Sequence, residues 1–289
     1  MPDLKKTGIA FLLCLSLYLP LFSEENDIRE LLGTIERESL EAFTETTETN
    51  EIAAADGAAR IRTQYYSAEA VQALPRLKAL ANQEPEFNKI IFRLEGYPKN
   101  KEIILEIKRL ASPAPESYEK MVSFTIQNDG AMLITGSDQQ IQAVIGNSRG
   151  FLPGEKVYYR FRTVDGEVDK EVWGIPTPAI VRDKDHQVVL KAELVSVMPT
   201  VYQISFPKMN EGEEYELKST SVGNVVRSKP KYHKEKPLLY SPVAGGNSKG
   251  GEAILEIRRK AGPTYSIRLP WGCALEGYRS GKKTYSSKV

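Results

Sequence analysis

Apolar and charged residues alternate along most of the chain from residue 89 onward. In 102–110, Ile103, Leu105 and Ile107 alternate with charged side chains, which is the period of a strand with one exposed face. Segments of this kind predict strands at 89–94, 102–110, 121–127, 131–135, 141–145, 156–163, 167–173, 188–195, 201–206, 215–219, 253–258 and 265–269. Short strands separated by turn signals, such as those at 128–130 and 164–166, favour β-sandwiches over a parallel α/β fold.

The spacing of apolar residues along the chain is different before residue 85. Apolar residues recur at helical spacing in 26–43, which predicts an amphipathic helix. Alanine-rich stretches at 51–62 and 68–82 predict two more short helices. Their apolar faces are narrow, so this region is expected to dock on the sheets or on a partner.

The proline-rich stretch around Pro176 and Pro178 is the predicted boundary between two sandwiches. The predicted organisation is a signal peptide at 1–23, a helical N-terminal region at 24–84, a first β-sandwich domain at 85–176, a second at 177–272 and a basic C-terminal tail at 273–289. Loops are predicted at 227–236, which is basic, and at 245–251, which is rich in glycine.

Three short segments resemble fibronectin type III and bacterial immunoglobulin-like domains. In 151–163 a Pro-Gly corner leads into an alternating aromatic strand, in 209–217 Tyr215 stands where that fold has its corner tyrosine, and 96–103 is a third, shorter copy. The first segment departs from the pattern because Val157 occupies the tyrosine position. The resemblance implies tandem Ig-like β-sandwich domains. Together with the helical spacing before residue 85, the predicted fold class is mainly β, with these domains preceded by a short α-helical N-terminal region. It also implies that Tyr215 is buried with its hydroxyl on a backbone group, and it carries no functional residues.

The first 23 residues have the pattern of a secretory signal. Lys5 and Lys6 precede an apolar run at 8–22, which is shorter than the roughly 20 residues of a membrane-spanning helix and contains Pro20. Cleavage is expected before Glu24. An uncleaved anchor and a lipoprotein acylated at Cys14 stay open as alternatives.

Composition limits the chemistry of the exported chain. Cys14 and Cys273 are the only cysteines, so removal of the signal would leave one thiol and no intrachain disulfide. Charge is distributed unevenly: residues 24–60 hold eleven acids and three arginines, a balance of −8, whereas 227–289 hold fourteen Lys or Arg and four acids, a balance of +10. Such asymmetry is typical of either an internal contact between the ends or a basic surface for an anionic partner.

The sequence matches the known motifs of catalytic and metal-binding sites poorly. Residues 146–150 fit the G-x-S-x-G pattern, but Pro153-Gly154 and a strand follow where a hydrolase needs a helix. His186 and His233 are the only histidines, and neither has metal-ligand spacing. No catalytic residue, cofactor or metal is therefore predicted.

The one surface feature that stands out is the basic segment, defined here as residues 227–236. Cations interleaved with aromatic residues bind anionic partners, although the same charges also protect edge strands from aggregation. The predicted binding residues are Arg227, Lys229, Lys231, Tyr232, Lys234 and Lys236.

The sequence therefore favours an exported, non-enzymatic binding or structural module of the cell envelope or surface. An exported hydrolase using carboxylates and a secreted effector are the alternatives. The expected partner is a protein or an anionic envelope or surface polymer rather than a nucleic acid. Membrane association would arise only through residues 8–22, if they are not cleaved.

A reporter that is active only outside the cytoplasm tests export. Fused to residues 1–30, it should be active, because Lys5 and Lys6 precede the apolar run. N-terminal sequencing of the full-length product should find a chain beginning near Glu24. An inactive fusion would contradict the assigned compartment, and replacing Leu12 and Leu13 by Asp supplies the export-deficient control.

Overall fold

The computed structural model describes residues 59–73, 84, 86–138, 140–141, 143–185, 187–207, 209–242, 249–259 and 262–287. The predicted signal peptide at 1–23, the helix at 26–43, and the residues Cys14 and His186 lie outside the described residues. Within the described part, no helix has the length and apolar character needed to cross a membrane.

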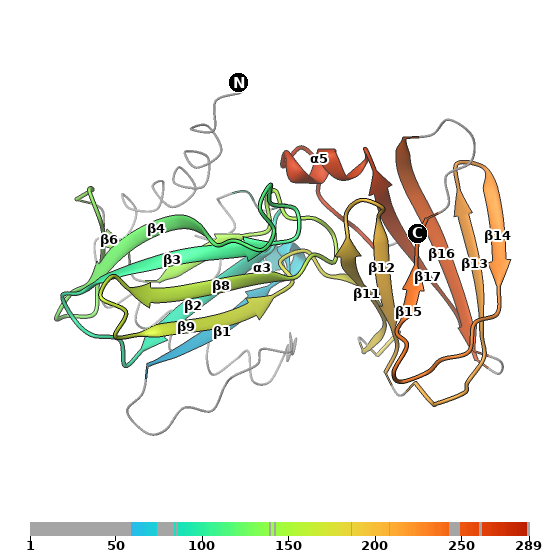
Figure 1. The fold of residues 1–289 in the computed structure, drawn as a ribbon, viewed down its shortest axis with the longest axis horizontal. Helices are drawn as coiled ribbons and strands as arrows, with labels where there is room; N and C mark the ends of the chain where they lie inside the picture. Colours follow the sequence, from blue (N-terminus) through green and yellow to red (C-terminus); the bar gives the residue numbers. More distant parts are fainter. Residues whose placement is uncertain are drawn as a thin grey trace. The chain divides into compact units, whose positions relative to one another are not determined.

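The chain divides into two compact units. The first contains residues 1–109, 114–147 and 157–174, and the second contains 110–113, 148–156 and 175–289. Both are built from antiparallel sheets, as Figure 1 shows for each unit.

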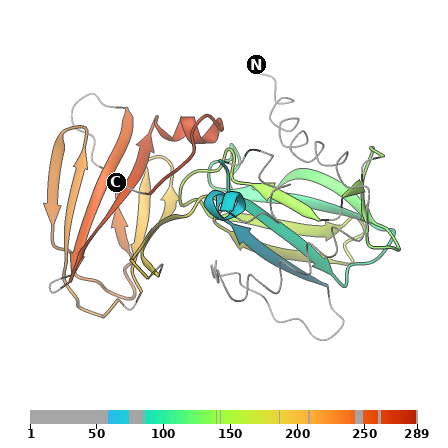
Figure 2. The ribbon, with the colours of Figure 1, turned by 180° about the vertical axis from the view of Figure 1, so that it is seen from behind.

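The first unit has a six-stranded sheet in the order β6-β5-β4-β3-β8-β9 and a three-stranded sheet in the order β1-β2-β7. Phe92 of β2 contacts Tyr159 and Phe161 of β8 at ring-centroid distances of 4.7 and 5.4 Å, so the two sheets face each other. The strand β1 lies beside β2 (Figure 2). The elements are β1 Arg60–Tyr66, α3 Ala68–Ala73, β2 Lys89–Glu95, β3 Glu102–Arg109, β4 Glu119–Ile126, β5 Met132–Ile134, β6 Gln140–Ile141, β7 Val144–Asn147, β8 Val157–Thr163 and β9 Asp169–Gly174.

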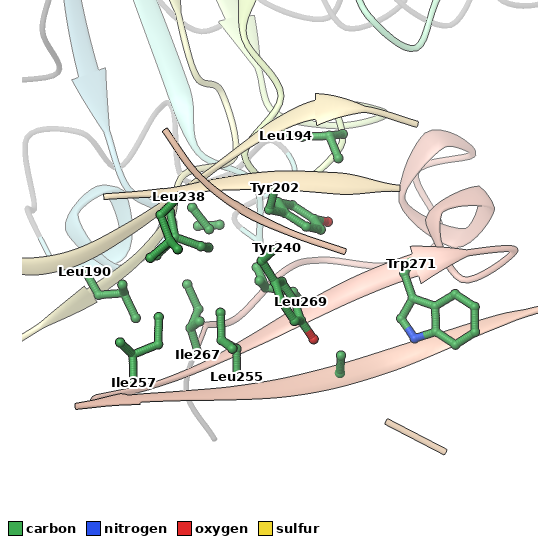
Figure 3. Close-up of a cluster of buried hydrophobic side chains, with 14 of the residues drawn as sticks. Leu190, Leu194, Tyr202, Leu238, Tyr240, Leu255, Ile257, Ile267, Leu269 and Trp271 are labelled. Atoms are coloured by element: carbon green, nitrogen blue, oxygen red, sulfur yellow. The ribbon is translucent and has the colours of Figure 1, made fainter. Parts of the chain in front are cut away.

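The second unit packs two four-stranded sheets, in the orders β10-β11-β12-β15 and β14-β13-β16-β17. The elements are β10 Ala179–Arg182, β11 Val188–Ser196, β12 Val201–Ser205, β13 Tyr215–Ser221, β14 Asn224–Ser228, β15 Leu238–Tyr240, β16 Gly250–Arg259, β17 Thr264–Gly272 and α5 Leu275–Arg279. Side chains of the two sheets meet in one buried cluster, in which Leu190 and Tyr202 lie opposite Leu255 and Ile267 (Figure 3). Burying a side chain of this size contributes about 1.5–3 kcal/mol, so alternate positions of these strands supply most of the driving force.

A buried carboxylate attaches two loops to the second unit. Glu155 is fully buried, and its Oε1 and Oε2 accept hydrogen bonds from the backbone N–H groups of Ala111 and Leu152 at 2.8 and 2.9 Å. The bond from Ala111 joins residues 110–113 to residues 148–156, and the bond from Leu152 lies within the second of these segments. Both segments separate strands of the first unit in the sequence. The packing of the second unit therefore depends on residues far from it in the chain.

The Pro-Gly corner brings this carboxylate into place. Gly154 has φ of +76°, and a Cβ at this position would stand 2.6 Å from the carbonyl oxygen of Ala192. Its N–H donates to Thr177 O at 2.8 Å, and its own carbonyl accepts from the N–H of Leu194 at 2.8 Å. Glycine is required here because the two backbones approach too closely for a side chain.

The predicted mainly β architecture is confirmed, because antiparallel sheets pair face to face in both units. The hairpin around Gly130 is confirmed by the pairing of β4 with β5, and that around Gly166 by the pairing of β8 with β9. The helix at 68–82 is confirmed for Ala68–Ala73, where the described helix ends.

Two local predictions before residue 146 are wrong. The helix predicted at 51–62 is wrong at residues 60–62, which begin β1, and its residues 51–58 lie outside the described residues. Ile61 is buried in a ladder with Leu94, and this distant pairing overrides the local helical pattern. The single strand predicted at 141–145 is two strands. Ile141 pairs with β5, whereas Val144 pairs with β2 in the other sheet, and the hydrophobic pattern does not record that crossing.

Several predictions in the second unit also need correction. The glycine-rich loop at 245–251 is wrong at its end, since Gly250 and Gly251 form ladder pairs with Gly272 and Trp271. The strands β10, β14 and β15 were not predicted, because each has only three to five residues and so carries little periodic signal. The C-terminal segment contains α5, whose Leu275 and Tyr278 are buried in the cluster.

Tyr215 is buried as the resemblance implies, but its hydroxyl partner differs. The hydroxyl donates to Glu213 Oε2 at 2.9 Å and not to a backbone group. The ring stacks on Phe206, with centroids 5.2 Å apart. The tyrosine that does bind a backbone group in such a segment is Tyr97 of the first unit, whose hydroxyl donates to Phe161 O at 3.3 Å.

A strained turn joins β13 to β14, and relieving it should stabilise the protein. Val222 and Gly223 have φ of +48° and +78°, the pattern of a type I′ turn, in which a β-branched residue is sterically disfavoured. Val222→Asn should raise the free energy of unfolding by about 1 kcal/mol, because Asn tolerates this conformation. Chemical denaturation measures the change. Val164→Asn, at another exposed valine but without positive φ, is the control, and equal effects of the two substitutions would refute turn strain as the cause.

Removing the Tyr215 hydroxyl should destabilise the second unit. Desolvation opposes ionisation of Glu213, but hydrogen bonds from Tyr215 and Asn210 and the charge of Arg259 together hold its pKa below the usual value. Tyr215→Phe should therefore cost about 1 kcal/mol at neutral pH.

The cost of Tyr215→Phe should depend on pH in one direction. A carboxyl with a lowered folded-state pKa contributes stability above its unfolded pKa of about 4.3, and that contribution disappears as the pH falls through the folded-state value. The difference between wild type and variant in urea unfolding should thus shrink below about pH 4. A difference that grows on acidification would contradict the bond to the carboxylate, and Tyr232→Phe supplies a control at a tyrosine without a described hydroxyl bond to an acid.

Candidate functional site

The basic segment begins in the edge strand β14 and continues beyond the end of that strand. Arg227 lies in β14, opposite Lys218 of β13. Beyond β14 the backbone still pairs with the start of β13: the N–H of Tyr215 donates to Pro230 O at 2.9 Å, and that of Tyr232 donates to Glu213 O at 2.8 Å. The predicted loop is therefore wrong at residues 227–228, which belong to β14, whereas residues 229–236 lie outside the named strands and are held by isolated backbone bonds.

The five predicted cations are all exposed, and they differ in their partners. Lys229 Nζ pairs with Glu216 at 3.1 Å. In the part of the chain that the structure describes, the side chains of Arg227, Lys231 and Lys236 have no ion-pair partner. Within the described residues no carboxylate compensates these three charges.

The carboxylates next to the segment keep their charge. Hydrogen bonds from Arg258 and Lys229 lower the pKa of Glu216. The pKa of Glu211 is lowered by a hydrogen bond from the backbone N–H of Lys234 and by the side chain of His233, whose Nδ1 lies 2.7 Å from Oε1. The surface thus carries mixed charge, with Lys229 and His233 beside carboxylates and the other cations of the segment without an ion pair among the described residues.

Tyr232 differs from the other predicted site residues. It is half-buried and packs against the hydrophobic cluster of the second unit, while its backbone pairs with Glu213 and Gly212. Tyr240, which the sequence placed near the segment, is buried with its hydroxyl 2.8 Å from Ser219 Oγ. These aromatic residues anchor the strand and do not offer exposed faces for stacking.

Exposed valines beside the cations are the feature that sequence reasoning missed. Val222, Val225 and Val226 are 53, 46 and 42% exposed. The sequence did contain a signal for the β13–β14 hairpin. Val222 and Gly223 form a two-residue connection between the strand-like runs 215–221 and 224–228. It was overlooked because Val does not favour the positive φ that such a turn requires.

Buried charges elsewhere have structural partners. In the first unit Glu106 accepts two hydrogen bonds from Arg162, at 2.9 and 3.0 Å, and the ammonium of Lys89 donates to Glu84 O at 3.1 Å. Among the described residues no cluster of three or more His, Cys, Asp or Glu could hold a metal ion. Ser148, the serine of the G-x-S-x-G match, directly follows β7. A turn at 149–150 comes next, where a nucleophile elbow would have a helix.

Comparison with known proteins gives little information about the function of this chain. No family model and no curated protein matches the chain. Solved structures that match include a two-domain fibronectin type III segment of chicken tenascin (10% identity, 64% of this chain and 91% of that chain, TM-score 0.22). Others are a tetra-tandem repeat of a large adhesion protein (12%, 74% and 49%, 0.23) and the FN1–FN3 domains of chicken CNTN1 (9%, 65% and 63%, 0.22).

The tenascin and CNTN1 structures are made of fibronectin domains, the class of fold that the three short segments of this chain resemble. Identities and TM-scores this low support no argument about function. The β-sandwich architecture rests on the sheets of the two units themselves, and the chain spans under two thirds of two of the three matched structures.

Proposed function

We propose that this chain is an exported, non-enzymatic binding module of the cell envelope or surface. Its partner is a protein or an anionic envelope or surface polymer, and the binding surface is the basic segment. The proposal rests chiefly on Arg227, Lys231 and Lys236, which are exposed and without ion-pair partners in the described part of the chain.

The way the segment is held strengthens this proposal. Backbone hydrogen bonds to β13 fix the strand, and the half-buried Tyr232 anchors it to the core of the second unit. The backbone that carries Arg227, Lys229 and Lys231 is therefore fixed, which reduces the backbone entropy that binding would otherwise cost. An anionic partner gains charge-assisted contacts without breaking internal ion pairs, except at Lys229.

A charge-neutralised variant tests the binding surface. Replacing Arg227, Lys231, Lys234 and Lys236 by Gln should abolish retention on heparin near 0.15 M salt, where exposed charges act over only about 8 Å. The melting temperature should change little, since exposed charges contribute little to folding. Wild-type retention should also fall steeply as salt increases.

The control removes the same charge from other places. Lys99, Lys120, Lys184 and Lys282 are exposed, so their replacement by Gln changes the net charge equally and leaves the basic segment intact. Equal loss of retention in both variants would mean that only net charge matters, and the assigned surface would be wrong. Faster proteolysis before residue 85 in the first variant would instead indicate that the acidic residues 24–60 occupy the segment.

A further inference from the structure

The edge of β14 has free backbone hydrogen-bonding groups. This strand ends the sheet order β14-β13-β16-β17, so in the described part of the chain only one side of it is paired (Figure 1). Ser221 and Asn224 close the two-residue turn, and antiparallel residues alternate between bonding to the neighbour and facing away from it. The N–H and C=O groups of Val225 and Arg227 therefore point outward from the sheet.

Both faces of this edge are partly apolar. Val226 lies opposite Ser219, on the side of the sheet that carries the core, and Val225 lies opposite Thr220, on the other side. The two valines are 42 and 46% exposed. An edge with unpaired groups and exposed β-branched residues is what a further strand requires, and proteins usually obstruct such edges.

We propose that β14 binds an extended segment of a partner protein by strand addition, and that this segment alternates acidic and apolar side chains. The inference rests on the proposed function and specifies its partner. Backbone hydrogen bonds to Val225 and Arg227 would hold the segment, and its apolar side chains would cover Val226.

The charges of the edge select an acidic segment. Arg227 faces Lys218 across the ladder and has no ion pair among the described residues, and Lys229 follows on the same face. A carboxylate placed opposite Arg227 on an added strand supplies the missing countercharge. A second copy of this chain would instead bring the same cations to the contact, so self-pairing is disfavoured.

The turn before β14 agrees with a binding role. Val222 is kept in a conformation that costs a β-branched residue stability, and its side chain is 53% exposed. Strain of this kind accumulates at functional sites, and here it extends the apolar surface of the edge by one residue.

A labelled synthetic peptide of alternating Glu and Val tests the proposal by fluorescence anisotropy with the full chain. Wild type should bind it and should not bind a Lys-Val peptide of equal length. Val225→Pro removes an outward N–H and no bond to β13, so it should weaken binding about tenfold, the loss expected for one or two backbone hydrogen bonds. Val225→Thr, which keeps the N–H and the β-branched shape, should bind within about threefold of wild type.

Other outcomes overturn the inference. Equal affinity of a folded Val225→Pro variant and wild type would mean that side-chain charge alone recruits the partner. If that variant does not fold, wild type is tested with the Glu-Val peptide N-methylated at alternate residues in both registers, and undiminished binding of both forms would have the same meaning. A concentration-dependent dimer of wild type that Val225→Pro abolishes would assign the edge to a second copy.

The two proposals can fail separately. Wild type that is retained on heparin but does not bind the Glu-Val peptide would refute strand addition and leave the anionic binding surface standing. Wild type that binds neither would refute both.

Discussion

The buried carboxylate of Glu155 is the interaction on which the second unit depends. It has no solvent exposure, and two backbone N–H groups, of Ala111 and Leu152, satisfy it. Leaving a buried hydrogen-bonding group unsatisfied costs about 1–3 kcal/mol, and more for a charged group, so the two loops that supply these donors contribute to the stability of the second unit. The close approach at Gly154 makes the arrangement possible, because only a residue without a side chain fits there.

Apart from these loops, the second unit is an ordinary β-sandwich, in which two sheets pack face to face. Alternate residues of β13, β16 and β17 are buried and face those of β11, β12 and β15 (Figure 3). Polar side chains that enter the core find partners: Trp271 Nε1 donates to Ser221 Oγ at 3.0 Å, and the Tyr202 hydroxyl donates to Pro270 O at 2.8 Å. These bonds allow the two sheets to bury their apolar faces, while Cys273 is a free, exposed thiol.

The candidate site arises from an uneven match between the two sheets. Ser219 of β13 contacts Tyr240 of β15, so the last strand of one sheet covers β13. All five residues of β14 are exposed, which means that no strand of the opposite sheet covers β14. Because the opposite sheet does not cover β14, the outward backbone groups of this strand, its exposed valines and Arg227, which has no ion pair among the described residues, lie together on one surface strip. Binding capacity here is a consequence of architecture, since no single residue type marks the strip.

Strand periodicity was enough to determine the mainly β character and most strand positions, because alternation such as that of Ile103, Leu105 and Ile107 is a local property. The exposed cations from Arg227 to Lys236 could also be identified, since charge composition is local. Tertiary structure alone decided that this segment pairs with β13, that residues 60–66 form a strand, and that Glu155 is buried. The second and third depend on contacts between residues far apart in the chain, which leave no periodic record in the sequence, and the first depends on a hairpin turn at Val222, a residue type that does not favour such a turn.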